Sequence, residues 1–481
     1  MGKAAVIGGV AVLGGVYLGL AAYGGGVVQR EYGAELDKLA QALPFVKVVD
    51  RQYDKGLFSA TASYGLRFGC ATPETGDGGQ AVTVTIRDRI AHGPFPAFSS
   101  VGWARLDTQI ALPAKAPEAL RRWIESMKPE AIRTVIGFDG AAATRVELPG
   151  GEFKSGGGSL RWQPLRGSFR VNGARTSVSY DFDLPELALD FANKGGSGSF
   201  RLVNLRGQSS SEMSDGMILD SGSGTATLDQ AQMQIDAARG KAQFELNQLK
   251  FANAAKTEND LLGATASMTG SASLKVGDKT FQFDKIELQE SMKRLHAPTL
   301  HKISLAFWQE LGGVCRQDSA GQAHSLKEKQ AAMLFGMKDL LAYDPEYSVD
   351  RIAITYAGQE GMLAYSVAAK GVTDEDLQQA DPRQLLGKLT ARASARLPVL
   401  WLEKIGAETS RGRLTPQQIH AQIDTLLKQT SEAGYIVREG DFVSSAALFE
   451  GGRLSVNGKA IDSPALMPPP GRPEQDGENQ N

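Results

Sequence analysis

An uncharged run of 25 residues, Ala4 to Val28, lies between Lys3 and Arg30 near the start of this chain. As a helix it would rise about 1.5 Å per residue and reach roughly 37 Å, which is enough to cross a hydrocarbon core of about 30 Å. We therefore expect an uncleaved membrane anchor that leaves everything after Arg30 on one side of a membrane. A cleaved signal peptide is the alternative, although the apolar run continues beyond the loose cleavage site at residues 19–21.

The charges and glycines of this segment indicate its orientation and a self-association face. Lys3 and the amino terminus are the only charges before the run, so the positive-inside tendency places the N-terminus in the cytoplasm and the large remainder outside. Gly15 and Gly19 have the small-xxx-small spacing that lets two transmembrane helices approach closely, which would give a homodimer. A glycine-rich signal sequence has the same composition without pairing, so both interpretations stay open.

Composition excludes one class of partner. The 481 residues carry 52 basic and 54 acidic side chains, a formal charge of −2, so no electrostatic case exists for binding nucleic acid. The length suggests roughly two to four domains or one extended architecture. Aromatic residues make up only 7% of the chain and glycines number 55, which is unusual for a tightly packed enzyme.

The sequence contains two cysteines, Cys70 and Cys315. Outside the cytoplasm they are free to form a disulfide, and closing a loop of about 245 residues would stabilise the fold by several kcal/mol on the chain-entropy model. Alternatively, both are buried free thiols. Their separation in sequence says nothing about their distance in space, so both alternatives remain.

Period-two alternation predicts that most of the chain is β-sheet. In the clearest strand, residues 81–90, Val82, Val84 and Ile86 share one face while threonines and arginines occupy the other. Similar short strands continue to about residue 290 between turn signals at Asn172-Gly173, Gly195-Gly196, Gly222 to Gly224 and Gly277-Asp278. We expect an α+β fold, mostly antiparallel β, with an elongated twisted sheet and C-terminal helices that cover one face or end of it.

These patterns divide the chain into segments: the N-terminus and anchor (1–29), a juxtamembrane helix (30–44), the β-rich region (45–290), a mixed α/β region (291–462) and a disordered tail (463–481). Within the mixed region, capping signals predict helices that begin near Ser325, Asp381 and Thr415. We expect the second of these helices to run on until Pro398 kinks or splits it. The Asn457-Gly458 pair predicts a closing hairpin.

No catalytic constellation is visible in the sequence. It lacks a Gly-x-Ser-x-Gly elbow, a Walker-type phosphate loop and a His-Glu-x-x-His motif. His296 and His301 are the one close histidine pair, and their spacing of five does not place two ligands on one helical face. We therefore predict no metal site and no cofactor.

The pentapeptide His92-Gly93-Pro94-Phe95-Pro96 stands out because it directly follows the strand at 81–90. Its two prolines remove backbone donors, so the segment must be a turn or an edge crossing, with Phe95 as a buried plug between them. We expect a structural role in which the ring nitrogens of His92 satisfy backbone groups that the prolines free. Alternatively, His92 is a functional group displayed at the end of a sheet.

Four features together resemble the YdgA-like envelope proteins of Gram-negative bacteria: the N-terminal anchor, Tyr-Asp-Lys-Gly-Leu-Phe-Ser at 53–59, the pentapeptide at 92–96, and Gly-Gly-Arg-Leu-Ser-Val-Asn-Gly at 451–458. That family has no assigned function. The resemblance implies an inner-membrane protein with a single span and a large periplasmic part, and it brings no catalytic residues.

Two classes of function fit these observations. The first is a non-enzymatic envelope component, either a scaffold for partner proteins or a β-groove that shelters lipid or another apolar ligand. The second is an envelope hydrolase whose site is assembled from dispersed residues near His92. A continuous apolar face with no packed partner would favour the groove.

Overall fold

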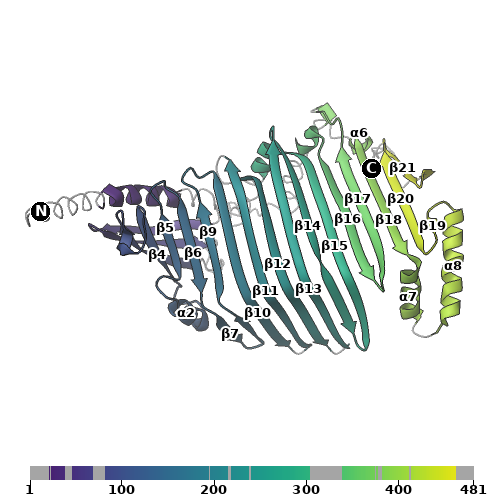
Figure 1. Cartoon of the computed structure of the whole chain (residues 1–481), viewed down its shortest axis with the longest axis horizontal. Helices are drawn as coiled ribbons and strands as arrows, with labels where there is room; N and C mark the ends of the chain where they lie inside the picture. Colours follow the sequence, from purple (N-terminus) through teal and green to yellow (C-terminus); the bar gives the residue numbers. More distant parts are fainter. Residues whose placement is uncertain are drawn as a thin grey trace, which may run out of the picture. The chain divides into compact units, whose positions relative to one another are not determined.

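A computed structural model describes residues 21–37, 46–68, 82–303, 339–373, 375–376, 382–410 and 413–461, except for residues 22, 194, 215–217 and 238–239. The chain forms two compact units, which are Met1–Gln282 with His296–Met337 (unit 1) and Phe283–Leu295 with Lys338–Asn481 (unit 2). Antiparallel β-structure dominates, which confirms the expected fold class at that level (Figure 1).

Several predicted features lie outside the described residues. They are most of the expected anchor, Gly15, Gly19, both cysteines, the helix expected from Ser325 and the tail after residue 461. Among the helices that the structure describes, none combines the length and apolar character needed to cross a bilayer.

The N-terminal part of unit 1 is a helix, 21–37, packed on an antiparallel meander. Consecutive strands of the meander pair with one another. They are β1 (Val46–Lys55), β2 (Ser59–Phe68), β3 (Val82–His92), β4 (Ala104–Ala111), β5 (Ile132–Ile136) and β6 (Ala142–Leu148). A 3-10 turn, η1 (Pro96–Phe98), lies between β3 and β4, and α2 (Glu118–Glu125) lies between β4 and β5.

Two prolines interrupt the next part of the sheet. β6 pairs with β9 (Leu165–Val171), whereas β7 (Gly151–Ser155) pairs with β8 (Gly158–Trp162), and β10 pairs with both β8 and β9. Pro149 and Pro164 stand at the breaks, where a residue without a backbone N–H cannot continue the ladder. The indoles of Trp123 and Trp162 both donate to the Pro149 carbonyl, at 3.1 and 3.2 Å, and so tie α2 to this break.

Unit 1 continues in strands much longer than the sequence predicts. They are β10 (Ser177–Asn193), β11 (Gly196–Ser214), β12 (Ile218–Ala237), β13 (Gly240–Glu258) and β14 (Leu261–Val276). The turn predicted at Gly222 to Gly224 is wrong, because these residues lie inside β12 and pair with both neighbours. A Cβ on Gly222 would lie 2.4 Å from Ser211 Oγ, so this glycine serves close packing across strands instead of a turn.

Unit 2 is a second antiparallel meander with helices. β15 (Lys279–His296), from Phe283 onward, pairs with β16, and the pairing continues through β17, β18 and β20 to β21 and β22. The bounds are η2 (Asp339–Tyr343), β16 (Glu346–Tyr356), β17 (Gln359–Ala369), α6 (Pro382–Gly387), β18 (Leu389–Pro398), α7 (Val399–Ser410), α8 (Pro416–Glu432), β19 (Val437–Glu439), β20 (Phe442–Glu450), β21 (Arg453–Val456) and β22 (Lys459–Ile461).

In unit 2 the predicted helix start at Thr415 and the predicted hairpin turn at Asn457-Gly458 are confirmed, whereas one predicted helix extends too far. Thr415 and Gln418 form the expected capping box at the start of α8, and Asn457-Gly458 forms the turn between β21 and β22. The helix predicted from Asp381 to Pro398 is wrong after Gly387, because residues 389–398 form β18 between β17 and β20. Pairing on both sides overrides the helix propensity of a leucine-rich and alanine-rich stretch.

Candidate functional site

The inward face of β3 carries alternate buried residues that meet helix 21–37. Ile86, Asp88, Ile90 and His92 are all buried, and they share one side of the strand because side chains alternate. The helix presents Gly25, Val28 and Tyr32 at spacings of three and four, which lie on one helical face. Gly25 lies against His92, Val28 packs in the cluster around Ile90, and Tyr32 bonds Asp88.

His92 joins the end of β3 to the start of this helix. Its ring is 1% exposed, and Nδ1 lies 3.0 Å from the carbonyl oxygen of Ala21. Because a carbonyl can only accept, Nδ1 carries the proton and donates. The expectation that the ring would bond groups freed by the prolines therefore differs from the geometry, because its partner is 71 residues away in sequence. Nε2 has no hydrogen-bond partner among the described residues.

The rest of the pentapeptide is a turn held by backbone bonds. Gly93 N donates to Trp103 O at 3.1 Å and Gly102 N donates to Pro94 O at 3.3 Å. The prediction of Phe95 as a buried plug is wrong, because this side chain is exposed and Pro96 is the buried residue. The left-handed backbone of Ala97 and Phe98, with φ of 49° and 51°, turns the chain outward here.

Asp88 is the centre of a buried polar cluster. Its carboxylate is 4% exposed and accepts hydrogen bonds from Thr108 Oγ1 at 2.5 Å and from the Tyr32 hydroxyl. Burial raises the pKa of Asp88, while the two hydroxyl donors oppose that rise. Burial and the neighbouring Asp88 raise the pKa of Tyr32 and of Tyr64. The cluster therefore holds the helix on the sheet through a buried carboxylate and partly buried hydroxyl groups.

Sequence reasoning missed this cluster although a signal was present. In the alternation of β3, Asp88 occupies the same face as Ile86 and Ile90, where an apolar residue is expected. A charged residue on the buried face of a strand requires a polar partner. The pattern could not say that this partner is Tyr32, because the helix and β3 are distant in sequence.

A second feature is an apolar stripe that crosses strands β7, β8 and β10–β14. Cross-strand partners in register form one row of apolar side chains, which are Phe153, Leu160, Leu189, Phe200, Met233, Phe244 and Leu274. Two flanking rows on the same face add Trp162, Leu187, Leu202 and Leu246 on one side and Phe191, Ile235 and Val276 on the other. We call these three rows the apolar stripe.

The apolar stripe is not covered in the described part of unit 1. Leu189, Met233 and Phe244 are 39–40% exposed. Of the helices described in this unit, 21–37 packs in the core beside β2–β4, and α2 packs on β4 and β7. The helical segment 297–303 begins beside the β13–β14 turn, where Ala297 N donates to Asp260 O at 2.8 Å. Seven strands about 4.8 Å apart give the stripe a length of roughly 29 Å. Such a patch on a sheet face marks a binding surface.

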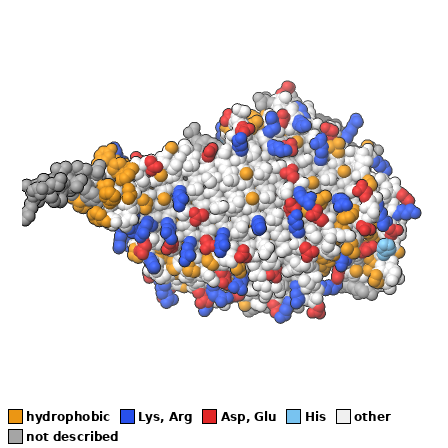
Figure 2. Space-filling view, viewed as in Figure 1, with side chains coloured by type: hydrophobic (Ala, Val, Ile, Leu, Met, Phe, Trp, Pro, Cys, Tyr) orange, Lys and Arg blue, Asp and Glu red, His pale blue; other side chains and the backbone are white. Residues whose placement is uncertain are grey.

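The opposite face of the same strands is polar. The residues adjacent to the central row of the stripe are, in register, Lys154, Ser159, Asp190, Ser199, Gln234, Gln243 and Lys275. Over the long strands, the face seen in Figure 2 carries mostly polar and charged side chains. The sheet is therefore amphipathic, as expected when one face contacts water and the other an apolar partner.

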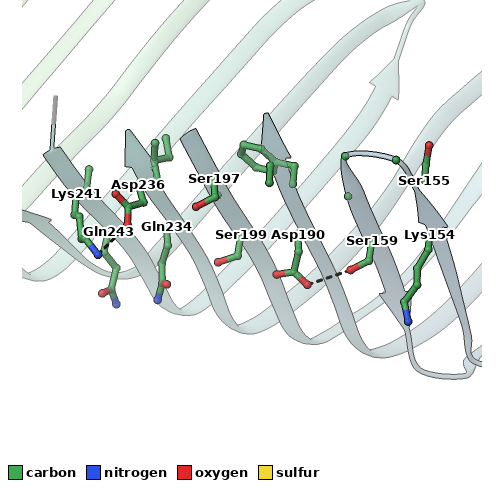
Figure 3. A pocket seen from close by; sticks show the side chains of 18 of the residues that line it. Lys154, Ser155, Ser159, Asp190, Ser197, Ser199, Gln234, Asp236, Lys241 and Gln243 are labelled. Carbon is green, nitrogen blue, oxygen red and sulfur yellow. Dashed lines mark hydrogen bonds and ion pairs between the residues drawn. The ribbon is translucent and has the colours of Figure 1, made fainter. Parts of the chain in front are cut away.

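An open hollow of about 980 Å³ near the hairpin ends of these strands is lined by polar residues of this face and also by Phe191 and Ile235 of the stripe (Figure 3). Asp190 accepts from Ser159 Oγ at 3.3 Å and from Arg161 at 2.8 Å, and Asp236 pairs with Lys241 at 2.8 Å. Asp236 raises the pKa of Lys241. The hollow has no histidine or cysteine among its described lining residues, and its carboxylates are already paired, so it offers hydrogen bonds more than acid–base chemistry.

Two other histidines within the described residues bond neighbouring side chains. His296 Nδ1 lies 2.8 Å from Thr299 Oγ1, and His420 Nδ1 lies 2.6 Å from Glu403 Oε1. Within the described ranges, no three histidine, cysteine, aspartate or glutamate residues are arranged to hold a metal ion.

Comparison with known proteins places the whole chain in one family. No curated protein and no solved structure matches it significantly. Residues 1–464, by contrast, match a family of bacterial proteins of unknown function, DUF945. The match extends over the helix, the pentapeptide, the long strands and unit 2. The chain therefore belongs to the DUF945 family of bacterial proteins.

Proposed function

We propose that this protein is a non-enzymatic component of the bacterial envelope that binds the acyl chains of lipids on the apolar stripe. The proposed setting is the inner membrane, with a single-pass anchor near the N-terminus and the large part in the periplasm. Two sequence observations support this setting: the uncharged run at residues 4–28 and the resemblance to YdgA-like envelope proteins.

The amphipathic register of the long strands carries the proposal. Apolar residues occupy the central row of the stripe on seven strands, and polar residues occupy the adjacent row on the other face. Apolar area removed from water contributes about 25 cal/mol per Å². A stripe of roughly 29 Å is longer than one lipid leaflet, whose hydrocarbon is about 15 Å thick, so an acyl chain can lie along it in full.

A scaffold that binds envelope proteins is the other occupant of such a face. Protein partners bring polar groups that must find hydrogen bonds, whereas the central row of the stripe has no polar side chain from Phe153 to Leu274. That uniformity favours acyl chains, which need only shape and apolar contact.

Native mass spectrometry of the detergent-extracted full chain tests the proposal. Met233 and Gln234 are adjacent residues of β12 on opposite faces, and both are exposed, so Met233→Glu and Gln234→Glu add the same charge to different faces. We expect phospholipid to co-purify with the wild type and with Gln234→Glu, and most of it to be lost from Met233→Glu. Thermal midpoints of the two variants show whether both remain folded.

Three outcomes would contradict lipid binding. One is a wild-type chain that carries no lipid under conditions that keep it folded. Another is an equal loss from both variants, which would remove the link to the stripe. The third is a second protein that leaves with the Met233→Glu substitution in place of lipid, which would identify a scaffold.

A further inference from the structure

A group of large hydrophobic side chains projects from the connections at the N-terminal end of unit 1. Tyr23, Leu57, Phe95, Phe98, Val101 and Phe138 are each at least half exposed, and Phe98 reaches 84%. Figure 2 shows hydrophobic side chains gathered at the N-terminal end of the described chain. Isolated exposed hydrophobic residues are ordinary, but a contiguous group marks a contact surface.

Backbone and ring contacts show that these connections are neighbours. His92 N donates to Phe58 O at 2.9 Å, which joins the β1–β2 turn to the end of β3. Trp103 Nε1 donates to Phe138 O at 3.0 Å, which joins the β3–β4 connection to the β5–β6 turn. The Trp103 ring lies 5.8 Å from the Tyr23 ring and 5.3 Å from the Phe138 ring. The helix start and the three connections therefore form one surface, which we call the aromatic rim.

The structure also limits which residues can belong to a membrane anchor. Ala21 is fully buried with its carbonyl bonded to His92, and Gly24 lies against Trp103. Residues from Ala21 onward are thus held by the sheet, although the sequence places them in the membrane. The uncharged run that precedes them is 4–20, whose 17 residues would reach about 26 Å as a helix, close to the lower limit of about 17 residues for crossing a bilayer.

Resting on the membrane anchor proposed above, we propose that the aromatic rim inserts into the interface of the same bilayer. An anchor that ends just before Ala21 would put the membrane surface near Tyr23, where the rim lies. Tyrosine, tryptophan and phenylalanine are suited to this depth because they have an apolar body, and in tyrosine and tryptophan a polar group as well. Interfacial side chains typically lie about 5–10 Å into the headgroup and acyl boundary.

The backbone conformation around Phe98 is consistent with a functional role for its exposed side chain. Ala97 and Phe98 both have left-handed φ angles, a conformation that is costly for residues with a bulky side chain. Such strain persists where the position of a side chain matters. Here the strained turn holds the most exposed phenyl ring of the rim outward.

Depth-dependent fluorescence quenching tests the rim in the full chain. In a Cys70→Ser, Cys315→Ser background, Phe98→Cys carries an environment-sensitive NBD label, and Asp278→Cys, in the β14–β15 turn at the far ends of the long strands, is the matched control. Each protein is reconstituted in phosphatidylethanolamine and phosphatidylglycerol vesicles that contain nitroxide lipids. We expect a blue shift and quenching at position 98, stronger with nitroxide near the headgroup than at the chain end, and neither effect at 278.

A second measurement keeps the native cysteines. Phe98→Trp in vesicles with brominated acyl chains should show more tryptophan quenching than the wild type, whereas Asp278→Trp should not. The proposal is overturned if position 98 behaves like position 278, whether both are quenched or neither is. It is also overturned if Phe98→Trp is folded in vesicles and gains no quenching.

Discussion

Gly25 shows how one absent Cβ decides the packing of the N-terminal helix. A Cβ at this position would lie 2.6 Å from His92 Cε1, closer than any ordinary contact, whereas a Cβ on Gly33 in the same helix would meet nothing within 4 Å. The sequence suggests two reasons for the glycines of the apolar run, a helix-association face and the composition of a signal sequence. At Gly25 the structure supplies a third reason, the close approach of helix and strand.

Replacing each of these glycines by alanine separates packing from helix propensity. Gly33→Ala should raise the free energy of unfolding by up to about 1 kcal/mol, because alanine favours the helix. Gly25→Ala gains the same propensity but forces the His92 ring to move, and such overpacking costs about 1–3 kcal/mol. Urea titrations should therefore find Gly25→Ala less stable than Gly33→Ala by about 1–3 kcal/mol. Equal stabilities would show that the helix does not depend on this contact.

Asp88 predicts a specific pH dependence. Burial raises its pKa above the unfolded value of about 3.9, so the folded protein binds this proton more tightly than the unfolded chain. The stability that this proton contributes is fully present below about pH 3.9 and is lost as the pH rises through the folded pKa. Asp88→Asn keeps the shape and hydrogen-bonding groups but does not titrate.

Urea titrations of the wild type and Asp88→Asn between pH 4 and 7 check this sign. The unfolding free energy of the wild type minus that of the variant should fall as the pH rises. A difference that stays flat would mean that Asp88 is not desolvated in the folded protein, and a difference that rises would mean that Tyr32 and Thr108 stabilise its charged form more than burial destabilises it.

At the scale of elements, signals within a few residues were reliable. Thr415 accepts from Gln418 N, and Gln418 Oε1 accepts from Thr415 N at 2.8 Å, as the capping pattern predicts. The interactions of a cap act over three residues, so a sequence motif describes them completely. The same holds for the turn at Asn457-Gly458, whose left-handed φ angles suit these two residues.

Two threonines of α8 give a matched test of that cap. Thr415→Ala removes the side-chain acceptor at the helix start and should destabilise unit 2 by about 1 kcal/mol. Thr425→Ala removes a hydroxyl that donates to the Ala421 carbonyl in the same helix, and should be neutral or slightly stabilising. Hydrogen exchange of α8 amides measures both. Faster exchange in both variants alike would show that the cap has no special weight.

Boundaries of helices and strands that depend on neighbouring strands are harder to predict from the sequence. Leu385, Leu386 and Leu389 read as one helical face, yet the helix ends at Gly387 and Leu389 begins a strand between two others. Propensity differences amount to a few tenths of a kcal/mol per residue, whereas residues 390–396 of β18 pair with a neighbouring strand on both edges. Residues 389–398 therefore form a strand instead of a helix because strands β17 and β20 lie on either side of them. Those two strands come from other parts of the sequence.

At the scale of the whole molecule, the two proposals use different surfaces of unit 1. The apolar stripe lies on the face of the long strands, and the aromatic rim lies on the connections around Tyr23 and Phe98. Loss of lipid from Met233→Glu and quenching at position 98 are therefore independent measurements. No residue belongs to both surfaces, whereas both proposals share the membrane anchor proposed for the uncharged N-terminal run.

Alternation with a period of two, several helix starts, several hairpin turns and the uncharged N-terminal run can all be read from the amino-acid sequence. Each of these features depends only on residues that are close together in the sequence. Three features appear only in the folded molecule: Asp88 bonds Tyr32, His92 bonds Ala21, and apolar residues of seven strands align in one stripe. These depend on register between distant segments, and register follows from the sum of many weak contacts that no single segment contains.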